Sequence, residues 1–227
     1  MADTSALLWP AAGSGPAARP GLGPGLVLGH GAGTRVTHPL LGRIAAGLAA
    51  HGHPVLSFNF AYSEVGRRPP DPAARLEAAF RDAVALARSL PDLLDRLLVL
   101  GGRSMGGRIA SHLAARGEPC AGLALLGYPL HPAGRPERLR TAHWPDLRVP
   151  VLFVQGDRDS LCDLDLLERE RRRLLGRVQT SVHVLADADH SFRVRGQPQG
   201  RVLDEVVTVV AEWLGALALQ APAGRAR

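Results

Sequence analysis

The sequence predicts an α/β fold built on one doubly wound, mostly parallel sheet with helices on both faces. Short runs of consecutive apolar residues alternate along the chain with longer segments of helical periodicity. Such runs are typical of strands that are buried on both faces. The 227 residues, 46% of them hydrophobic, are enough for one large domain with its own core. The alternation of strands and helices favours a parallel sheet joined by right-handed crossovers.

Seven segments are expected to form strands. Residues 6–9 would form a short edge strand, and six buried strands are expected at 26–28, 55–58, 97–100, 123–126, 151–154 and 182–185. Asp71 and Pro72 supply a cap and a first-turn proline for one of the intervening helices. The last helix is expected to bury a stripe formed by Leu203, Val206, Val207, Val210, Leu214 and Leu217.

Three regions follow from this pattern. Residues 1–25 are expected to hold the edge strand and a loop rich in glycine and proline, because the loop carries many backbone breakers and few large apolar residues. Residues 26–218 would form the main domain. Residues 219–227 have no periodicity and are expected to form a flexible tail.

Charge and composition argue against several classes of protein. The net charge of +6 comes from 27 arginines and 21 acidic residues, which are interspersed along most of the chain. The densest basic run, at 168–177, contains five arginines and two glutamates, a composition typical of a solvated helix face. We therefore expect no binding to nucleic acid.

Cys120 and Cys162 are too few for a disulfide scaffold or a cysteine-based zinc site. No two histidines show helical ligand spacing with a carboxylate, so neither a metal nor another cofactor is expected. The chain has no basic leader at its start and no run of 18 apolar residues. We expect a cytoplasmic protein without a membrane partner, and the sequence does not indicate its oligomeric state.

A Gly-x-Ser-x-Gly motif follows the strand expected at 97–100. It comprises Gly102, Ser104 and Gly106, and a helical segment begins directly after it. In this context the motif predicts a sharp turn that projects the serine hydroxyl above the sheet. A Cβ at either glycine would collide with the neighbouring strand and helix. The motif also occurs by chance, so the alternative is a flexible loop with an incidental serine.

Two further side chains complete a possible catalytic set. A serine hydroxyl needs a base, and the base needs an orienting partner. Asp157 and Asp159 follow the strand at 151–154, and His190 follows the strand at 182–185. Because parallel strands end at one edge of the sheet, we expect Ser104, Asp159 and His190 to meet there. Asp159 is preferred to Asp157 because it lies further past the turn, although the sequence leaves both open.

Other histidines compete for the role of base. His183 lies inside an expected strand and is interpreted as a packed or paired residue. His51 and His53 lie at the opposite end of the sheet. His131 follows a strand and is the hardest of the remaining histidines to exclude. Asp189 is expected to shape the loop of its neighbour His190.

An acyl-transfer reaction also needs two N–H donors for the developing oxyanion. Met105, directly after the serine, is expected to supply one. Ala32, in the loop after the strand at 26–28, is expected to supply the other, with Gly33 as the next choice. The same glycine-rich loop could also indicate dinucleotide binding, but Thr34 stands where that fingerprint has glycine or alanine, and no acid ends the next strand.

With these residues in place, the chain resembles the α/β-hydrolase superfamily from about residue 25 to residue 217. The likeness is greatest for a group that includes dienelactone-hydrolase-like bacterial proteins, a testis-expressed vertebrate protein and a hydrolase-like subunit of a histone-acetyltransferase complex. Five blocks carry it, at residues 30–33, 101–106, 127–132, 152–159 and 189–192. Arg103 and the Tyr-Pro-Leu-His-Pro block at 128–132 favour that group.

The resemblance implies a serine hydrolase with Ser104 as nucleophile, His190 as base and Asp159 as acid. Position 104 is serine, whereas dienelactone hydrolases proper use cysteine. The short start implies a sheet of six or seven strands, and the roughly twenty residues between Tyr128 and Val149 exclude a large helical lid. Because some relatives serve in protein complexes, a catalytically silent binding or complex-subunit protein is the alternative.

The expected substrate is a small ester or thioester that passes through an acyl-enzyme. Arg103, His30 and Gly33 are the expected substrate-binding residues. Arg103 could hold a substrate carboxylate through paired hydrogen bonds. Alternatively, Arg103 could make a structural bond to a loop carbonyl or to an acid.

Overall fold

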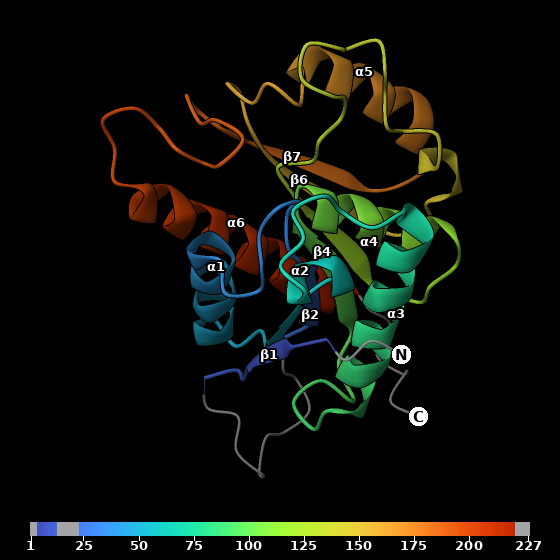
Figure 1. Cartoon of the computed structure of the whole chain (residues 1–227), viewed down its shortest axis with the longest axis vertical. Helices are drawn as coiled ribbons and strands as arrows, with labels where there is room; N and C mark the ends of the chain where they lie inside the picture. Colours follow the sequence, from blue (N-terminus) through green and yellow to red (C-terminus); the bar gives the residue numbers. More distant parts are fainter. Residues whose placement is uncertain (1–3, 13–22, 221–227) are drawn as a thin grey trace.

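A computed structural model describes residues 4–12 and 23–220. Its centre is a seven-stranded sheet in the order β1-β3-β2-β4-β5-β6-β7 (Figure 1). Strand β1 pairs with β3 in antiparallel fashion, and every other pair is parallel. The expected mostly parallel sheet is therefore confirmed. The strands are β1 (Ala6–Trp9), β2 (Gly25–Gly29), β3 (Val55–Phe58), β4 (Leu98–Arg103), β5 (Gly122–Leu126), β6 (Val151–Gly156) and β7 (Thr180–Leu185).

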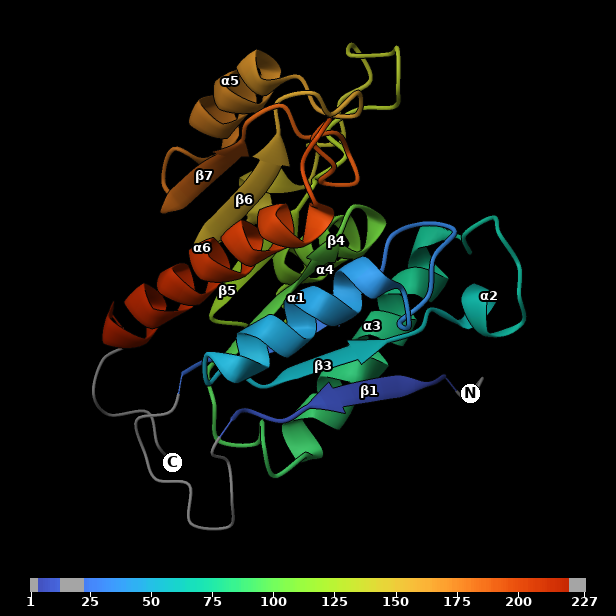
Figure 2. The same ribbon diagram turned by 90° about the vertical axis from the view of Figure 1, so that its left-hand side faces the viewer.

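Helices cover both faces of the sheet (Figure 2). Helices α1 (Pro39–Ala50) and α6 (Gln199–Gln220) bury their apolar stripes in one core. Helices α3 (Ala73–Ser89), α4 (Met105–Ala115) and α5 (Leu164–Leu175) pack into the other. The short α2 (Ala61–Glu64) follows β3. All six residues of the expected stripe on the last helix are buried.

Consecutive strand residues belong alternately to the two cores. Val27 lies in the core beneath α3 and α4, whereas Leu26 and Leu28 lie in the core beneath α1 and α6. This alternation follows from the twofold period of a strand. It explains why the central strands appear as uninterrupted apolar runs in the sequence.

Strand β7 differs from the expectation of burial on both faces. Val182 and Val184 are 36% and 43% exposed, whereas Leu185 points into the core beneath α6. The reason is position: β7 is the last strand of the sheet, and the face that carries the two valines is covered only in part. The apolar run at 182–185 therefore belongs to an edge strand that is only partly buried.

The helix expected from Asp71 and Pro72 also begins differently. Helix α3 starts at Ala73 with Pro72 as its N-cap and without a side-chain cap bond. The buried carboxylate of Asp71 instead pairs with Arg67 at 2.7 Å. Pro72 ends the loop before α3, and Asp71 binds Arg67 within that loop.

The predicted ends of the domain are described only in part. Residues 13–22 of the predicted loop and residues 221–227 of the predicted tail lie outside the described residues. Helix α6 continues to Gln220, two residues into the segment expected as tail.

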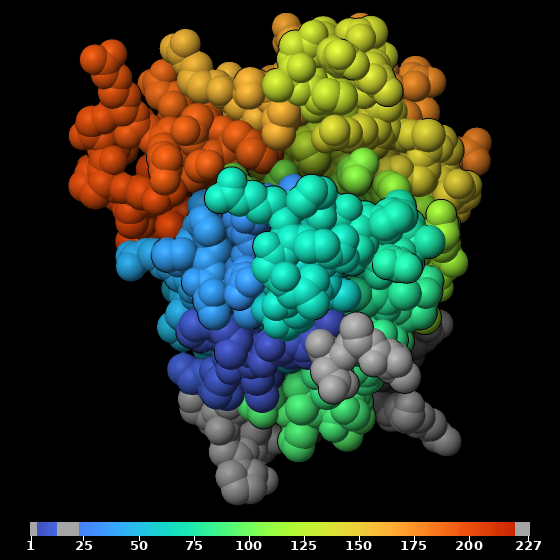
Figure 3. Space-filling model, viewed as in Figure 1, coloured from blue at the N-terminus to red at the C-terminus, as the bar shows by residue number. Residues whose placement is uncertain are grey.

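The segment between β5 and β6 contains no large lid. Residues 127–150 are all described, and their one helical element is the 3-10 turn η1 (Trp144–Asp146). Figure 3 looks onto the edge of the sheet where the parallel strands end. In this view the residues after β3, in cyan, cover the centre of the face, with the insert after β5, in yellow-green, above them and the loop after β7, in orange, at the upper left.

Candidate active site

Ser104 occupies a sharp turn between β4 and α4. Its φ of 51° and ψ of −113° are rare for a residue with a Cβ. A backbone of this kind is found where the surroundings enforce it, often at functional sites. The strand before Ser104 and the helix directly after it fix both sides of the turn. The expected strand–turn–helix context of the motif is confirmed.

The two glycines of the motif permit this turn to approach β2. A Cβ on Gly102 or on Gly106 would overlap the carbonyl oxygen of Gly29. Gly102 also has a φ of 144°, which L side chains rarely adopt. The predicted steric collision at these two glycines is therefore confirmed, and the group they would strike belongs to β2.

His190 lies between Ser104 and Asp159. Its Nε2 is 3.0 Å from the Ser104 Oγ, and its Nδ1 is 2.7 Å from the Asp159 Oδ2. The structure thus brings together three side chains that are up to 86 residues apart in the sequence. Asp157 is exposed and takes no part in this chain of hydrogen bonds.

The carboxylate of Asp159 is completely buried and accepts three hydrogen bonds. Gln155 Nε2 donates to Oδ2 at 2.6 Å, and the Leu161 N–H donates to Oδ1 at 2.8 Å. His190 supplies the third. Because both oxygens are held, the carboxylate has a fixed orientation toward the imidazole. Sequence reasoning missed Gln155, although a polar residue near the end of an apolar strand was the signal for it.

Arg103 fixes the loop that carries His190. Its Nη2 donates to the His190 carbonyl at 2.8 Å and lies 3.2 Å from the Ser191 Oγ. This is the structural alternative considered for Arg103, and it differs from direct binding of a substrate. Burial lowers the pKa of the guanidinium, while the carboxylates of Asp159 and Asp189 oppose that shift.

Asp189 shapes the same loop through its own side chain. Its Oδ1 accepts the N–H of Ser191 at 2.7 Å and that of Arg193 at 2.9 Å. The expectation that Asp189 organises the loop, rather than pairing with the adjacent imidazole, is confirmed. The ring of His190 is left to bond with Asp159 and Ser104.

A tight turn at residues 31–34 lies beside the serine. The Thr34 N–H donates to the Gly31 carbonyl at 3.2 Å, and Gly33 has a φ of 70°. This is the pattern of a type II turn, which needs glycine at its third position. A Cβ on Gly31 would lie 3.7 Å from that of Ser104, so the turn passes directly beside the hydroxyl.

The two expected oxyanion donors belong to the start of α4 and to this turn. Met105 is the first residue of α4, where backbone N–H groups have no acceptor within the helix. Ala32 is the exposed second residue of the turn. The Gly33 N–H, by contrast, donates to the Tyr62 hydroxyl at 3.3 Å. Gly33 is exposed, and its N–H is already used in this bond.

His30 is not placed to touch a substrate. The ring is completely buried, its Nε2 accepts the Phe60 N–H at 3.1 Å, and its Nδ1 lies 2.8 Å from the Gly31 carbonyl. Burial lowers the pKa of the ring, which favours the neutral form. The prediction of His30 as a substrate-binding residue is therefore wrong, because the ring joins the turn at 31–34 to the segment after β3.

Two competing histidines have structural partners elsewhere. His131 is buried, its Nε2 accepts the Asp163 N–H at 3.1 Å, and it joins the insert after β5 to the N-cap of α5. His183 lies 2.8 Å from the Glu205 Oε1 on α6. The interpretation of His183 as a paired residue is confirmed, but the side chain is 32% exposed and does not belong to the core.

Within the described residues there is no group of three or more His, Cys, Asp or Glu side chains arranged to hold a metal ion. None of the described helices is long and apolar enough to cross a membrane.

A family model for an alpha/beta hydrolase domain matches residues 23–217. The chain belongs to the α/β-hydrolase family. The match spans the whole sheet except β1, and it includes each side chain of the hydrogen-bonded set at the strand ends.

Solved structures of other α/β-hydrolases have the same fold. An alpha-beta serine hydrolase homologue from Coxiella burnetii is 16% identical, with a TM-score of 0.71 over 93% of this chain and 91% of that one. A dienelactone hydrolase from Anabaena variabilis is 22% identical, with a TM-score of 0.64 over 86% of each chain. A serine hydrolase without a lid from Xanthomonas campestris is 19% identical, with a TM-score of 0.66 over 92% and 87%. At these identities the likeness concerns the fold.

Proposed function

We propose that this α/β-hydrolase is a serine hydrolase that cleaves small esters or thioesters through an acyl-enzyme. The observation that carries the proposal is the chain of hydrogen bonds from Ser104 through His190 to Asp159, with distances of 3.0 and 2.7 Å. Nucleophile, base and orienting acid need hydrogen-bond contact of this kind. The exposed turn and the absence of a helical lid in residues 127–150 suit a small substrate that enters from the face seen in Figure 3.

In the first half of the reaction, His190 Nε2 takes the proton of Ser104 as Oγ attacks the carbonyl carbon of the substrate. The carbonyl π electrons move to its oxygen, which becomes a tetrahedral oxyanion. The N–H groups of Met105 and Ala32 would stabilise that charge, and each such donor contributes about 3 kcal/mol to transition-state stabilisation. Collapse of the intermediate breaks the bond to the leaving alcohol or thiol, which receives the proton from His190.

In the second half, water replaces the leaving group. His190 removes a proton from water, and the resulting hydroxide equivalent attacks the acyl carbon bound to Ser104. Collapse releases the carboxylic acid, and the proton on His190 returns to Oγ. Throughout, Asp159 accepts the hydrogen bond from Nδ1, which fixes the tautomer and stabilises the imidazolium.

The proposal is tested with a fluorophosphonate probe and with p-nitrophenyl acetate and butyrate. The wild-type protein should be labelled and should hydrolyse at least one ester, whereas Ser104→Ala should do neither. Ser89→Ala, a hydroxyl deletion at the end of α3, is the matched control and should retain both properties. A folded wild-type protein that neither reacts with the probe nor cleaves esters would indicate a catalytically silent binding protein.

A further inference from the structure

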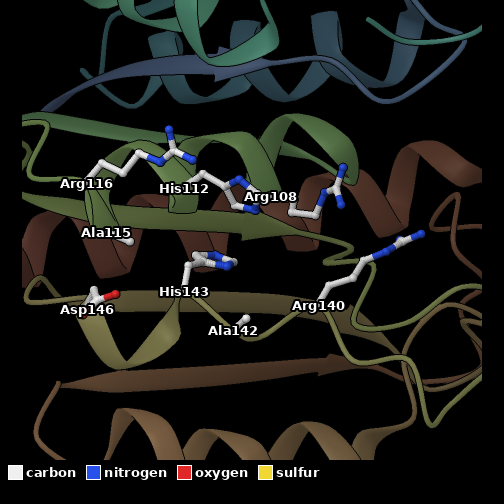
Figure 4. A pocket seen from close by; sticks show the side chains of 8 residues that line it. All are labelled: Arg108, His112, Ala115, Arg116, Arg140, Ala142, His143 and Asp146. Carbon is white, nitrogen blue, oxygen red and sulfur yellow. The ribbon is translucent and has the colours of Figure 1, made fainter. Parts of the chain in front are cut away.

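A cavity of about 370 Å³ lies beside α4 and includes none of the hydrogen-bonded residues Ser104, His190 and Asp159. It is formed between α4 and the segment that leads into η1 (Figure 4). Its volume is within the range of small-molecule sites. The lining residues are Arg108, His112, Ala115, Arg116, Arg140, Ala142, His143 and Asp146.

The charges in this cavity are unevenly compensated. Arg116 pairs with the buried Glu77 at 2.8 Å, and His112 Nδ1 lies 3.1 Å from the same carboxylate. By contrast, no carboxylate of the described residues forms an ion pair with Arg108 or Arg140. Arg140 contributes one Nη1 bond, to the Pro129 carbonyl at 3.3 Å. In Figure 4 these two arginines lie at one end of the cavity, and Arg116 and Asp146 lie at the other.

The positive charges of Arg108 and Arg140 influence each other. Burial, followed by the charge of Arg108, lowers the pKa of Arg140. Arginine remains protonated despite such a shift, so both positive charges persist in the lining of one cavity. Partly buried charges are costly unless a partner of opposite sign is present. A bound anion would supply that partner for both guanidiniums at once.

Histidine rings form the middle of the cavity. The centroids of His112 and His143 are 4.3 Å apart with the rings inclined at 60°. His143 Nε2 lies 2.8 Å from the Ser111 Oγ, which donates its own hydrogen to the Arg108 carbonyl. The ring of His143 is thus held in place with a hydrogen on Nε2. Next to it, Ala115 and Ala142 provide small apolar surfaces.

We propose that this cavity binds a small organic phosphate, with the phosphoryl group between Arg108 and Arg140 and the organic part against the ring of His143. Guanidinium groups match the geometry of phosphate oxygens and are preferred for their recognition. The cavity has room for more than the anion alone, and its centre offers an aromatic surface. Arg108 lies one turn along α4 from Ser104, so the site is adjacent to the proposed catalytic residues but does not contain them.

The test is a titration of the protein with phenyl phosphate at constant ionic strength, in which NMR or calorimetry measures binding. Saturable binding is expected, and Arg108→Gln or Arg140→Gln should each weaken it by about tenfold or more. Arg138→Gln removes the same charge from an exposed neighbouring residue and should change the affinity less than twofold. Ala142→Phe fills the cavity without any change in charge and should also abolish binding. Circular dichroism of each variant establishes that it is folded.

Inorganic phosphate is titrated in parallel to identify the source of the anion. Weaker binding of inorganic phosphate than of phenyl phosphate is expected, because only the organic ligand reaches His143. The two ligands could instead bind with equal affinity, and the Arg108 and Arg140 variants could abolish the binding of both. That result would support a phosphate site whose ligand is the free anion. Binding that is non-saturable, or identical in wild type and in the Arg108→Gln/Arg140→Gln double variant, would overturn the proposal. None of these outcomes bears on hydrolysis at Ser104.

Discussion

The strand-end site, formed by Ser104, His190 and Asp159, differs from the α4 cavity, which lies between α4 and the segment that leads into η1. The difference is whether the polar groups of each have partners within the protein. At the strand ends, both ring nitrogens of His190 and both carboxylate oxygens of Asp159 have partners within the protein. In the α4 cavity, Arg108 and Arg140 have no acidic partner among the described residues. The first arrangement is complete without a ligand, which suits a preorganised catalyst. The second leaves charge uncompensated, which suits a ligand of opposite sign.

The largest expected effect lies at the strand ends, where removal of one group disables the whole set. Ser104→Ala and His190→Ala should each lower kcat by about 10⁴–10⁶-fold, because nucleophile and base act as a unit. The double variant should be no worse than the worse single variant. Multiplicative losses would contradict the idea that the two side chains act together. Steady-state kinetics with p-nitrophenyl butyrate measure this.

A smaller effect is expected from Arg103, which acts on the set through a loop. Arg103→Gln should lower kcat about 10–100-fold on a neutral ester with little change in KM, because the His190 carbonyl loses its donor. Arg103→Lys, which keeps the charge, should restore part of the activity.

The same variant distinguishes positioning from substrate binding. If Arg103 instead held a substrate carboxylate, Arg103→Gln would raise KM for an ester that carries a carboxylate and would spare neutral esters. Comparison of p-nitrophenyl butyrate with the p-nitrophenyl half-ester of succinate separates the two outcomes. A variant that changes neither kcat nor KM would contradict both roles.

His143, which lines the cavity, should make the free energy of unfolding depend on pH. Burial, then the neighbouring His112 and the arginines 108 and 116, lower its pKa to about 3. The unfolded chain, with a pKa near 6.5, therefore binds the proton more readily. Stability should be complete above pH 6.5 and should fall as the pH drops toward 3, by up to about 1.4 kcal/mol per pH unit from this group.

The variant His143→Gln tests this assignment, because glutamine is polar but does not titrate. Its unfolding free energy should decline less steeply than that of wild type between pH 6.5 and pH 4. Urea denaturation at several pH values measures the slope. Equal slopes for the two proteins would show that other buried histidines, such as His30, account for the acid sensitivity.

The smallest effect concerns the unpaired charges without a ligand. Arg108→Gln should raise Tm by about 1–3 °C in phosphate-free buffer, because it relieves repulsion from Arg140 worth less than about 1 kcal/mol. Wild type should regain the difference when phenyl phosphate is added, and the variant should not. A lower Tm for the variant in phosphate-free buffer would mean that Arg108 is already compensated.

Much of the proposed site could be predicted from the sequence, because its residues directly follow strands. Ser104, Asp159 and His190 each follow an apolar run, and parallel strands bring such positions to one edge. The same reasoning failed for His30, which also follows a strand. Its ring turns into the protein to bond with the Phe60 N–H, and the direction of a buried ring is set by its neighbours and not by its position after a strand.

The sequence by itself predicted the succession of strands and helices along the chain, the sharp serine turn and the set of polar side chains at the strand ends, because these depend on local patterns and on the rules of parallel sheets. Only the tertiary structure decided that Gln155 orients the acid, that Arg103 holds the loop of the base, and that β7 leaves two valines exposed. It also joined Arg108 to Arg140, 32 positions apart, in one cavity. Contacts between residues so far apart depend on how α4 packs against the insert, which no local pattern encodes.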